Sequence, residues 1–200
     1  MNPGFLFISA WVTWGLSWLI AAAWSSRAQA RVAATRGDVL LYRALVLIGF
    51  ALLNPTASRA LAARPLWNVG LAGAYALVGA TILGLSFTWW ARLWLGRLWS
   101  SAVTRKEGHR VIDRGPYALV RHPIYTGLIG ATLATAAAIA TWPAMLAVIL
   151  VGVGFWLKAS IEERFLAAEL GQDAYDGYRR RVPMLIPFWP PGRPRNDQPA

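Results

Sequence analysis

Residues 124–157, IYTGLIGATLATAAAIATWPAMLAVILVGVGFWL, form a run without a single charged residue. About twenty apolar residues cross a bilayer as one helix, so this run is too long for a single span. Thr141-Trp142-Pro143 interrupts it near the middle, and proline disfavours helical geometry in the residue before it. We therefore predict a helical hairpin, which would return both ends of the run to the same side of a membrane.

The composition favours an integral membrane protein. Hydrophobic residues make up 56% of the 200 residues and charged residues only 14%, and the mean hydropathy is +0.41. The net charge of +11 does not call for nucleic acid as a partner, because arginines placed between hydrophobic spans follow the positive-inside rule. The chain has no cysteine and only two histidines, which excludes disulfides and thiolate metal sites, and no metal site is expected.

We predict an all-α, polytopic fold with about five membrane-spanning helices, of which the last two are the arms of the hairpin. The first three are residues 5–24, 39–53 and 66–90. Trp11 and Trp89 are among the tryptophans that lie near the ends of apolar runs, as is typical of membrane–water interfaces. The expected parts of the chain are three N-terminal transmembrane helices (1–91), a catalytic region with a basic interfacial segment, the hairpin and short cytosolic helices (92–190), and a flexible tail (191–200).

The distribution of basic residues predicts the orientation. Five spans place the two most basic regions, 92–121 and 158–200, on the same side as the loop 25–38. The positive-inside rule then puts that side, with the C-terminus and the active site, in the cytoplasm. No cleavable signal peptide is expected, because Met1-Asn2-Pro3-Gly4 lacks a basic n-region. The predicted location is a plasma (inner) membrane of bacterial type.

The hairpin brings together polar residues that are distant in the chain. His122 lies at the foot of its first arm, and the adjacent Glu162 and Glu163 lie at the foot of its second. Carboxylates that directly follow an uncharged helix are costly unless they reach water, a cation or a ligand. Tyr117 and Tyr125 belong to the same rim. Carboxylates, aromatic faces and a helix start suit a ligand that is itself both cationic and anionic.

Simpler interpretations stay open on these residues alone. His122 could cap a transmembrane helix at the interface. The two glutamates could form a solvated helix start paired with Lys158 or Arg164, an arrangement worth little energy. The return of both ends of the hairpin to one rim is the observation that favours a functional site.

Several motifs follow one another between residues 105 and 190. They are Gly115-Pro116-Tyr117, Arg121-His122-Pro123-Ile124-Tyr125-x-Gly127, Glu162-Glu163-x-x-Leu166, Tyr175-x-x-Tyr178 and Arg181-Val182-Pro183. Together they resemble the isoprenylcysteine carboxyl methyltransferase family, whose wider kin are phospholipid methyltransferases. The first three spans match that family only in hydropathy.

The resemblance implies a methyltransferase that depends on S-adenosylmethionine (S-adenosyl-L-methionine) and acts on a lipophilic small molecule or a lipidated substrate in the bilayer. A carboxylate of the isoprenylcysteine type is the acceptor we favour. Lys158 stands where eukaryotic members carry a basic residue that contacts the substrate, so Lys158 and His122 are the candidate catalytic residues. The resemblance assigns cofactor binding to His109, Val111, Ile112, Tyr117, His122, Pro123, Tyr125 and Glu162.

Elementary chemistry supports the same cofactor. Backbone N–H groups at the helix start after Pro123 can receive its carboxylate. Glu162 or Glu163 can accept hydrogen bonds from its ribose hydroxyls or its ammonium, and tyrosine faces can lie against its sulfonium. A carboxylate acceptor is ionised at neutral pH and needs no general base. An amine or thiol acceptor would need one, and His122 is the first candidate.

Other functions stay open. A phospholipid amine or a small thiol could be the methyl acceptor. Membrane sterol-type reductases that use NADPH share a similar histidine-proline rim, and a non-catalytic membrane component is a third alternative. The sequence leaves the identity of the acceptor and the oligomeric state undetermined.

Overall fold

The computed structural model describes residues 2–22, 30–31, 35–96, 104–105, 113–170 and 172–189. The predicted cofactor residues His109, Val111 and Ile112 and the predicted tail 191–200 lie outside these residues.

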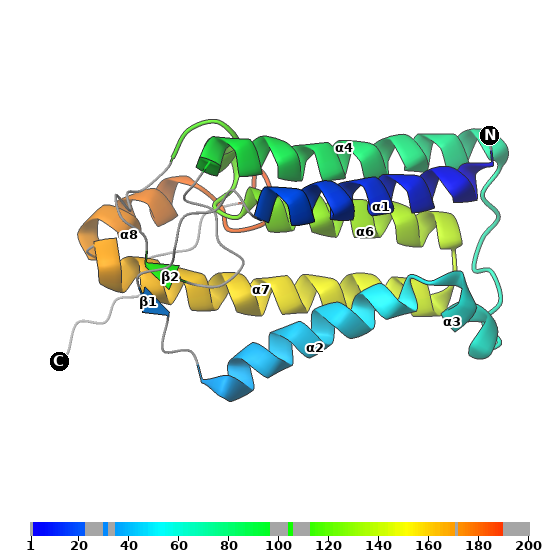
Figure 1. The fold of residues 1–200 in the computed structure, drawn as a ribbon, viewed down its shortest axis with the longest axis horizontal. Helices are drawn as coiled ribbons and strands as arrows, with labels where there is room; N and C mark the ends of the chain where they lie inside the picture. The colour runs from blue at the N-terminus through cyan, green and yellow to red at the C-terminus, as the bar shows by residue number, and fades with distance from the viewer. Residues whose placement is uncertain are drawn as a thin grey trace.

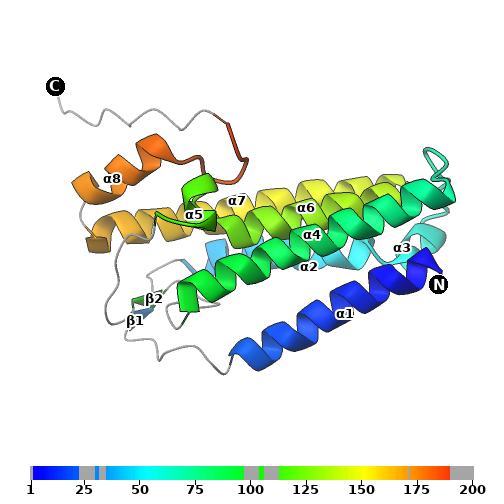
Figure 2. The same cartoon turned by 90° about the horizontal axis from the view of Figure 1, so that it is seen from above.

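Long helices that run side by side dominate the structure (Figures 1 and 2). The only strands among the described residues are β1 and β2, two residues each, which pair antiparallel with Ala30 opposite Arg105. In chain order the elements are α1 (Pro3–Ala22), β1 (Ala30–Arg31), α2 (Arg36–Leu52), α3 (Pro55–Ala60), α4 (Leu71–Leu95), β2 (Thr104–Arg105), α5 (Pro116–Leu119), α6 (Pro123–Ile139), α7 (Trp142–Leu170) and α8 (Gln172–Arg181).

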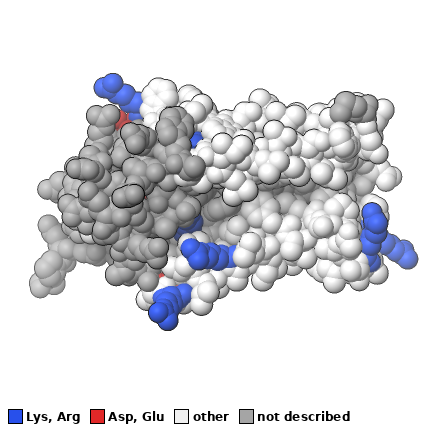
Figure 3. Space-filling view, viewed as in Figure 1, with Lys and Arg blue, Asp and Glu red and all other residues white. Residues whose placement is uncertain are grey.

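Among the described residues, three helices are long and apolar enough to cross a membrane: α1, α4 and the part of α7 from Trp142 to Ala168. The apolar helix α6 is shorter, with 17 residues, and α2 also has 17 residues. The face shown in Figure 3 is largely uncharged over the long helices, with basic side chains mostly toward the ends. The expected helical, polytopic membrane architecture is confirmed. The number of five spans stays a prediction.

The hairpin within residues 124–157 is confirmed. α6 ends at Ile139, and Ala140 follows in the left-handed conformation with φ 55°. α7 then begins at Trp142, with Pro143 in its first turn, where the missing N–H of proline costs nothing. α7 continues to Leu170, so Glu162 and Glu163 lie within this helix rather than after it.

The third helix differs from the prediction, because α4 covers Leu71–Leu95 rather than residues 66–90. Arg92, expected in a basic interfacial segment, is completely buried in the last turns of α4. Its guanidinium donates to the carbonyl of Ala21 at 2.8 Å and to the carbonyl of Gly96. These are carbonyls at the C-terminal ends of α1 and α4, where a cation is favourable. Arg92 can therefore stay buried in the last turns of α4.

Several tryptophans also join neighbouring helices, while their placement in interfacial belts stays a prediction. Trp11 Nε1 donates to Thr135 Oγ1 at 3.0 Å, which links α1 to α6. Trp89 Nε1 donates to Ser17 Oγ at 3.1 Å, which links α4 back to α1. Hydrogen bonds between helices satisfy polar groups that lipid cannot.

Two glycine contacts set how closely the helices approach. A Cβ added at Gly84 of α4 would lie 2.8 Å from the carbonyl oxygen of Gly127 on α6. A Cβ added at Gly154 of α7 would lie 2.7 Å from Val46 and 3.1 Å from the carbonyl oxygen of Tyr42, both on α2. In a membrane the hydrophobic effect does not drive helices together, so their association depends on close packing, which small residues allow. The glycines therefore hold α4 against α6 and α2 against α7.

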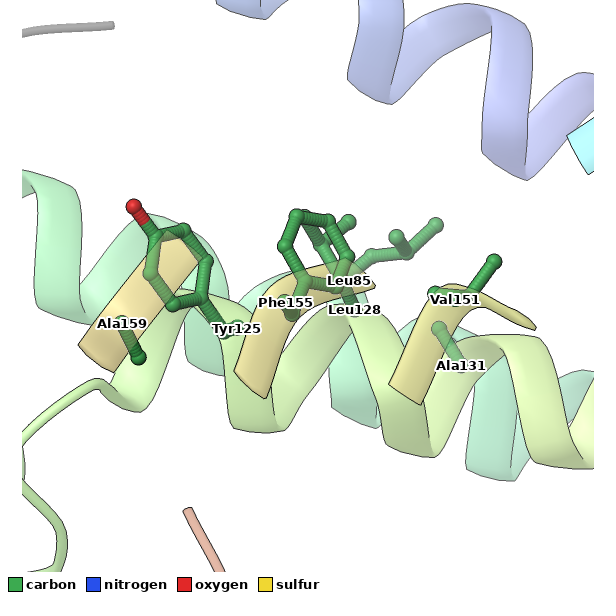
Figure 4. Close-up of a cluster of buried hydrophobic side chains, with 7 residues drawn as sticks. All are labelled: Leu85, Tyr125, Leu128, Ala131, Val151, Phe155 and Ala159. Atoms are coloured by element: carbon green, nitrogen blue, oxygen red, sulfur yellow. The ribbon is translucent and has the colours of Figure 1, made fainter. Parts of the chain in front are cut away.

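The main cluster of buried side chains joins α4, α6 and α7 (Figure 4). Phe155 and Tyr125 stack at the end of this cluster that leads to the foot of the hairpin, with ring centroids 4.9 Å apart and an interplanar angle of 8°. The core is therefore continuous with the rim on which the candidate residues lie. Its members are Leu85, Tyr125, Leu128, Ala131, Val151, Phe155 and Ala159.

Candidate cofactor site

The two ends of the hairpin meet as expected. His122 is the residue before the first turn of α6, but its side chain makes no capping hydrogen bond to the helix. Its imidazole lies instead between the two glutamates of α7. Nδ1 is 3.5 Å from Glu162 Oε2, and Nε2 is 3.3 Å from Glu163 Oε1. Each ring nitrogen therefore faces a different carboxylate.

These contacts affect the protonation of His122. Burial lowers the pKa of the imidazole, but hydrogen bonds to Glu162 and Glu163 and their negative charges raise it more. The pKa therefore lies above its ordinary value of 6.5. A protonated imidazole has an N–H on each nitrogen and can donate to both carboxylates.

Glu162 faces the aromatic side of the site. The Tyr125 hydroxyl donates to Glu162 Oε1 at 2.7 Å, and the Lys158 ammonium lies 3.8 Å from the same oxygen. The ring of Tyr125 stacks on the imidazole of His122, with centroids 5.5 Å apart and nearly parallel planes. Glu162 thus lies beside the tyrosine ring and the lysine ammonium.

Glu163 faces the opposite surroundings and is only 5% exposed. Arg121 Nε donates to its Oε1 at 2.6 Å, and Arg121 Nη2 donates to its Oε2 at 3.2 Å. Arg179 Nε, on α8, lies 3.4 Å from Oε2. Two arginines and His122 therefore surround this carboxylate. Both glutamates lie within α7 and are largely buried, so a solvated helix start fits neither of them. Of the pairings in that alternative, Lys158 with Glu162 is present, whereas the exposed Arg164 has no ion pair with either glutamate.

Residues 182–186, which we call the C-terminal strap, run beside the start of α6. The backbone N–H of Arg121 donates to the carbonyl of Pro183 at 2.8 Å, and that of His122 donates to the carbonyl of Met184 at 3.1 Å. Thr126 Oγ1 donates to the carbonyl of Leu185 at 2.6 Å. The strap thereby satisfies backbone groups that are buried at the rim.

The other predicted cofactor residues in the described part of the chain also lie at this rim. Pro123 is the buried first residue of α6, and Tyr117 is buried on α5. Burial raises the pKa of Tyr117 well above its ordinary value, with the charges of Tyr178 and Glu162 adding to the effect, so its hydroxyl stays protonated. The Tyr178 hydroxyl donates to the carbonyl of Tyr117 at 2.7 Å, which connects α8 to α5.

Lys158 lies beside a residue that the sequence analysis missed. Its ammonium is 5.1 Å from the ring centroid of Tyr125 and 5.9 Å from that of Tyr42, a buried residue of α2. Nothing in the sequence around Tyr42 marks it as a site residue, because only the packing of α2 on α7 brings it here. Arg179, which pairs with Glu163, was likewise not among the predicted site residues.

The chemistry of these residues fits a cofactor that carries positive charge. The ammonium of Lys158 lies near both the Glu162 carboxylate and the face of Tyr125, so an organic cation is compatible with these neighbours. Within the described residues, no group of three or more histidine, cysteine, aspartate and glutamate side chains could hold a metal ion.

The middle of the chain matches a known protein family. Residues 77–168 match the model of the isoprenylcysteine carboxyl methyltransferase (ICMT) family. The expected family resemblance is confirmed. The ICMT match contains His122, Glu162 and Glu163. It begins within α4 rather than at residue 105, and the motifs after residue 168 lie outside it.

A named relative agrees with the ICMT match. Protein-S-isoprenylcysteine O-methyltransferase of Schizosaccharomyces pombe is 34% identical over 90 residues. The aligned part makes up 44% of this chain and 38% of the relative, so the chain matches well under half of that protein's length.

Proposed function

We propose that the protein is an integral membrane methyltransferase that uses S-adenosylmethionine to methylate a lipophilic acceptor. The observation that carries the proposal is the closure of the hairpin. It brings His122 and Tyr125 of α6 against Glu162 of α7, within the residues that match the ICMT family. The relative's name supports an isoprenylcysteine-type carboxylate as the acceptor.

The proposed cofactor roles follow from the chemistry of each side chain. Glu162 would take the ribose hydroxyls or the ammonium, and the ring of Tyr125 would lie against positive charge. The backbone at the start of α6, after Pro123, would receive the carboxylate. Tyr117 would close the rim from α5. His109, Val111 and Ile112 are proposed from the family resemblance alone.

Positioning is the main contribution that we propose for the protein. The cofactor supplies an activated methyl group, whose transfer is an in-line displacement. Acceleration then comes mostly from holding the acceptor oxygen in line with that group. The stacked rings of His122, Tyr125 and Phe155 and the bidentate pair of Arg121 with Glu163 make the rim rigid.

The surroundings of His122 favour a carboxylate acceptor. An amine or thiol has to lose a proton, which requires a general base. His122 has a carboxylate at each ring nitrogen and a raised pKa, so it favours the protonated form and is a poor base. A carboxylate is already ionised at neutral pH. We therefore propose O-methylation ahead of methylation of a phospholipid amine or a thiol, and positioning rather than proton abstraction for His122.

The proposal predicts saturable binding of S-adenosylmethionine to the purified protein in detergent or nanodiscs, measured by calorimetry. Glu162→Gln is expected to weaken binding about tenfold or more, because a charge-assisted hydrogen bond becomes a neutral one. Asp38→Asn is the matched control, since it neutralises an exposed carboxylate in the first turn of α2.

The same titration separates the alternatives. Binding of NADPH and not of S-adenosylmethionine would support the reductase interpretation. Binding of neither would support a non-catalytic membrane component. Equal affinity in wild type and Glu162→Gln would contradict the role of Glu162.

A further inference from the structure

The ammonium of Lys158 lies within the acidic and aromatic cluster at the rim. It is 3.8 Å from Glu162 Oε1, 5.1 Å from the centroid of Tyr125 and 5.9 Å from that of Tyr42. The side chain is only 13% exposed. A lysine near a membrane surface could otherwise extend its long stem to water. The nearby carboxylate and aromatic faces account for its position here.

Two of these neighbours, Glu162 and Tyr125, are the groups to which we assign the positive charge of the cofactor. Two cations near one carboxylate repel each other strongly where water is partly excluded. We propose that Lys158 is an internal placeholder: its ammonium takes the position of the cofactor's sulfonium until the cofactor binds, and Tyr42 is the second aromatic face of that position. This inference rests on the proposed function.

The contacts favour the sulfonium over the ammonium of the cofactor. A sulfonium has no N–H to donate, so it is recognised by charge and by aromatic faces rather than by hydrogen bonds. Lys158 Nζ is 3.8 Å from Glu162 Oε1, beyond hydrogen-bond distance, and two tyrosine faces lie near it. These neighbours of the ammonium, a carboxylate and two aromatic faces, are groups that recognise a cation by charge.

Of the cations at the rim, Lys158 is the one suited to move. Arg121 is held to Glu163 by two hydrogen bonds and also donates to the carbonyls of Arg179 on α8 and Val182 of the strap, so its planar group has a fixed orientation. Lys158 is a point charge on a flexible four-carbon stem. Before the cofactor binds, Lys158 neutralises the partly buried Glu162, and after displacement it stays at the rim, where it can face an anionic acceptor.

The comparison of S-adenosylmethionine with S-adenosylhomocysteine tests this proposal, because the second compound lacks the methyl group and has a neutral sulfur. We expect Lys158→Met to strengthen binding of S-adenosylmethionine relative to S-adenosylhomocysteine by roughly three- to tenfold, since the competing cation is gone. Lys158→Gln, which stays polar, should have the same effect. Both dissociation constants are measured by calorimetry in detergent, with thermal unfolding to verify the fold.

Arg164→Met is the matched control, because Arg164 is an exposed cation on the same helix. This variant should leave the ratio of the two dissociation constants unchanged. Unchanged dissociation constants of both compounds in Lys158→Met and Lys158→Gln would overturn the placeholder. Equal strengthening of both compounds would overturn the sulfonium position. Failure of wild type to bind either compound would instead reject the proposed function itself.

Tyr42 is tested by a pair of variants. Tyr42→Phe keeps the aromatic face and should keep the wild-type ratio. Tyr42→Leu removes the face and should weaken S-adenosylmethionine relative to S-adenosylhomocysteine by about threefold. A wild-type ratio in a folded Tyr42→Leu protein would overturn the assignment of Tyr42.

Discussion

Glu162 and Glu163 are neighbours in the chain but have different surroundings, because successive residues of an α-helix point about 100° apart. Glu162 contacts Tyr125 and Lys158. Glu163 is enclosed by Arg121 and Arg179. The buried glutamate therefore joins α7, α8 and the start of α6. Glu162 has the neighbours, Tyr125 and Lys158, that suit a ligand.

A matched pair of substitutions should distinguish the roles of the two glutamates. Glu163→Gln leaves the buried Arg121 without its counter-charge, and breaking such a pair costs about 3–5 kcal/mol of stability. Glu162→Gln should change the melting temperature much less and the cofactor affinity more. Thermal unfolding and calorimetry on both variants check this. Similar melting temperatures for Glu163→Gln and wild type would contradict the structural role.

The raised pKa of His122 predicts a dependence of stability on pH. Because the folded pKa exceeds the value in the unfolded chain, protonation of His122 stabilises the fold. This contribution is complete below about pH 6.5 and is lost as the pH rises through the folded pKa. The difference in melting temperature between wild type and His122→Gln should therefore shrink at alkaline pH. A difference that stays constant from about pH 5 to 9 would rule out this linkage.

At the scale of elements, the bundle depends on positions where a side chain cannot fit. α4 and α6 cross at Gly84 and Gly127, where backbone meets backbone. This crossing places His122, at the start of α6, at a fixed height relative to α4 and α7. Close packing of the helices is thus a condition for the geometry of the rim.

Alanine substitutions on α4 test this crossing. Gly84→Ala places a Cβ 2.8 Å from a carbonyl oxygen of α6, whereas a Cβ at Gly79 meets nothing within 4 Å. Both substitutions gain the same helix propensity, so their difference isolates the clash. Gly84→Ala should be less stable than Gly79→Ala by about 1–3 kcal/mol, as is usual for overpacking. Equal unfolding in increasing denaturant would contradict this contact.

At the scale of the whole molecule, segments far apart in the chain complete one rim. The C-terminal strap binds the backbone of Arg121 and His122, and α8 supplies Arg179 to Glu163. Tyr42 of α2 lies beside Lys158 at the same place. The candidate site therefore depends on chain segments outside the hairpin.

Truncation tests the contribution of the strap. A chain that ends at Arg181 loses two hydrogen bonds from Arg121 and one each from His122 and Thr126 to the strap, each worth about 1 kcal/mol. We expect it to be less stable by about 4 kcal/mol and to bind S-adenosylmethionine more weakly. A chain that ends at Trp189 keeps these contacts and should behave as wild type in both assays. Equal behaviour of the two truncated chains would show that the strap is dispensable.

The sequence alone determined the hairpin and the meeting of its ends. An uncharged run too long for one span, interrupted by Trp142-Pro143, has few other solutions in a membrane. His122, Glu162 and Tyr125 could therefore be placed at one rim without coordinates. These signals are local, because apolar length and proline act within one segment.

The tertiary structure decided what depends on contacts between segments. The burial of Arg92, the different partners of Glu162 and Glu163, and the position of Tyr42 beside Lys158 follow from how the helices rotate and cross. The helices α4 and α7 show no clear amphipathic stripe, since lipid and protein interior are both apolar. Hydrophobic pattern cannot indicate which face turns inward, so only packing at glycines and hydrogen bonds between helices set the rotation.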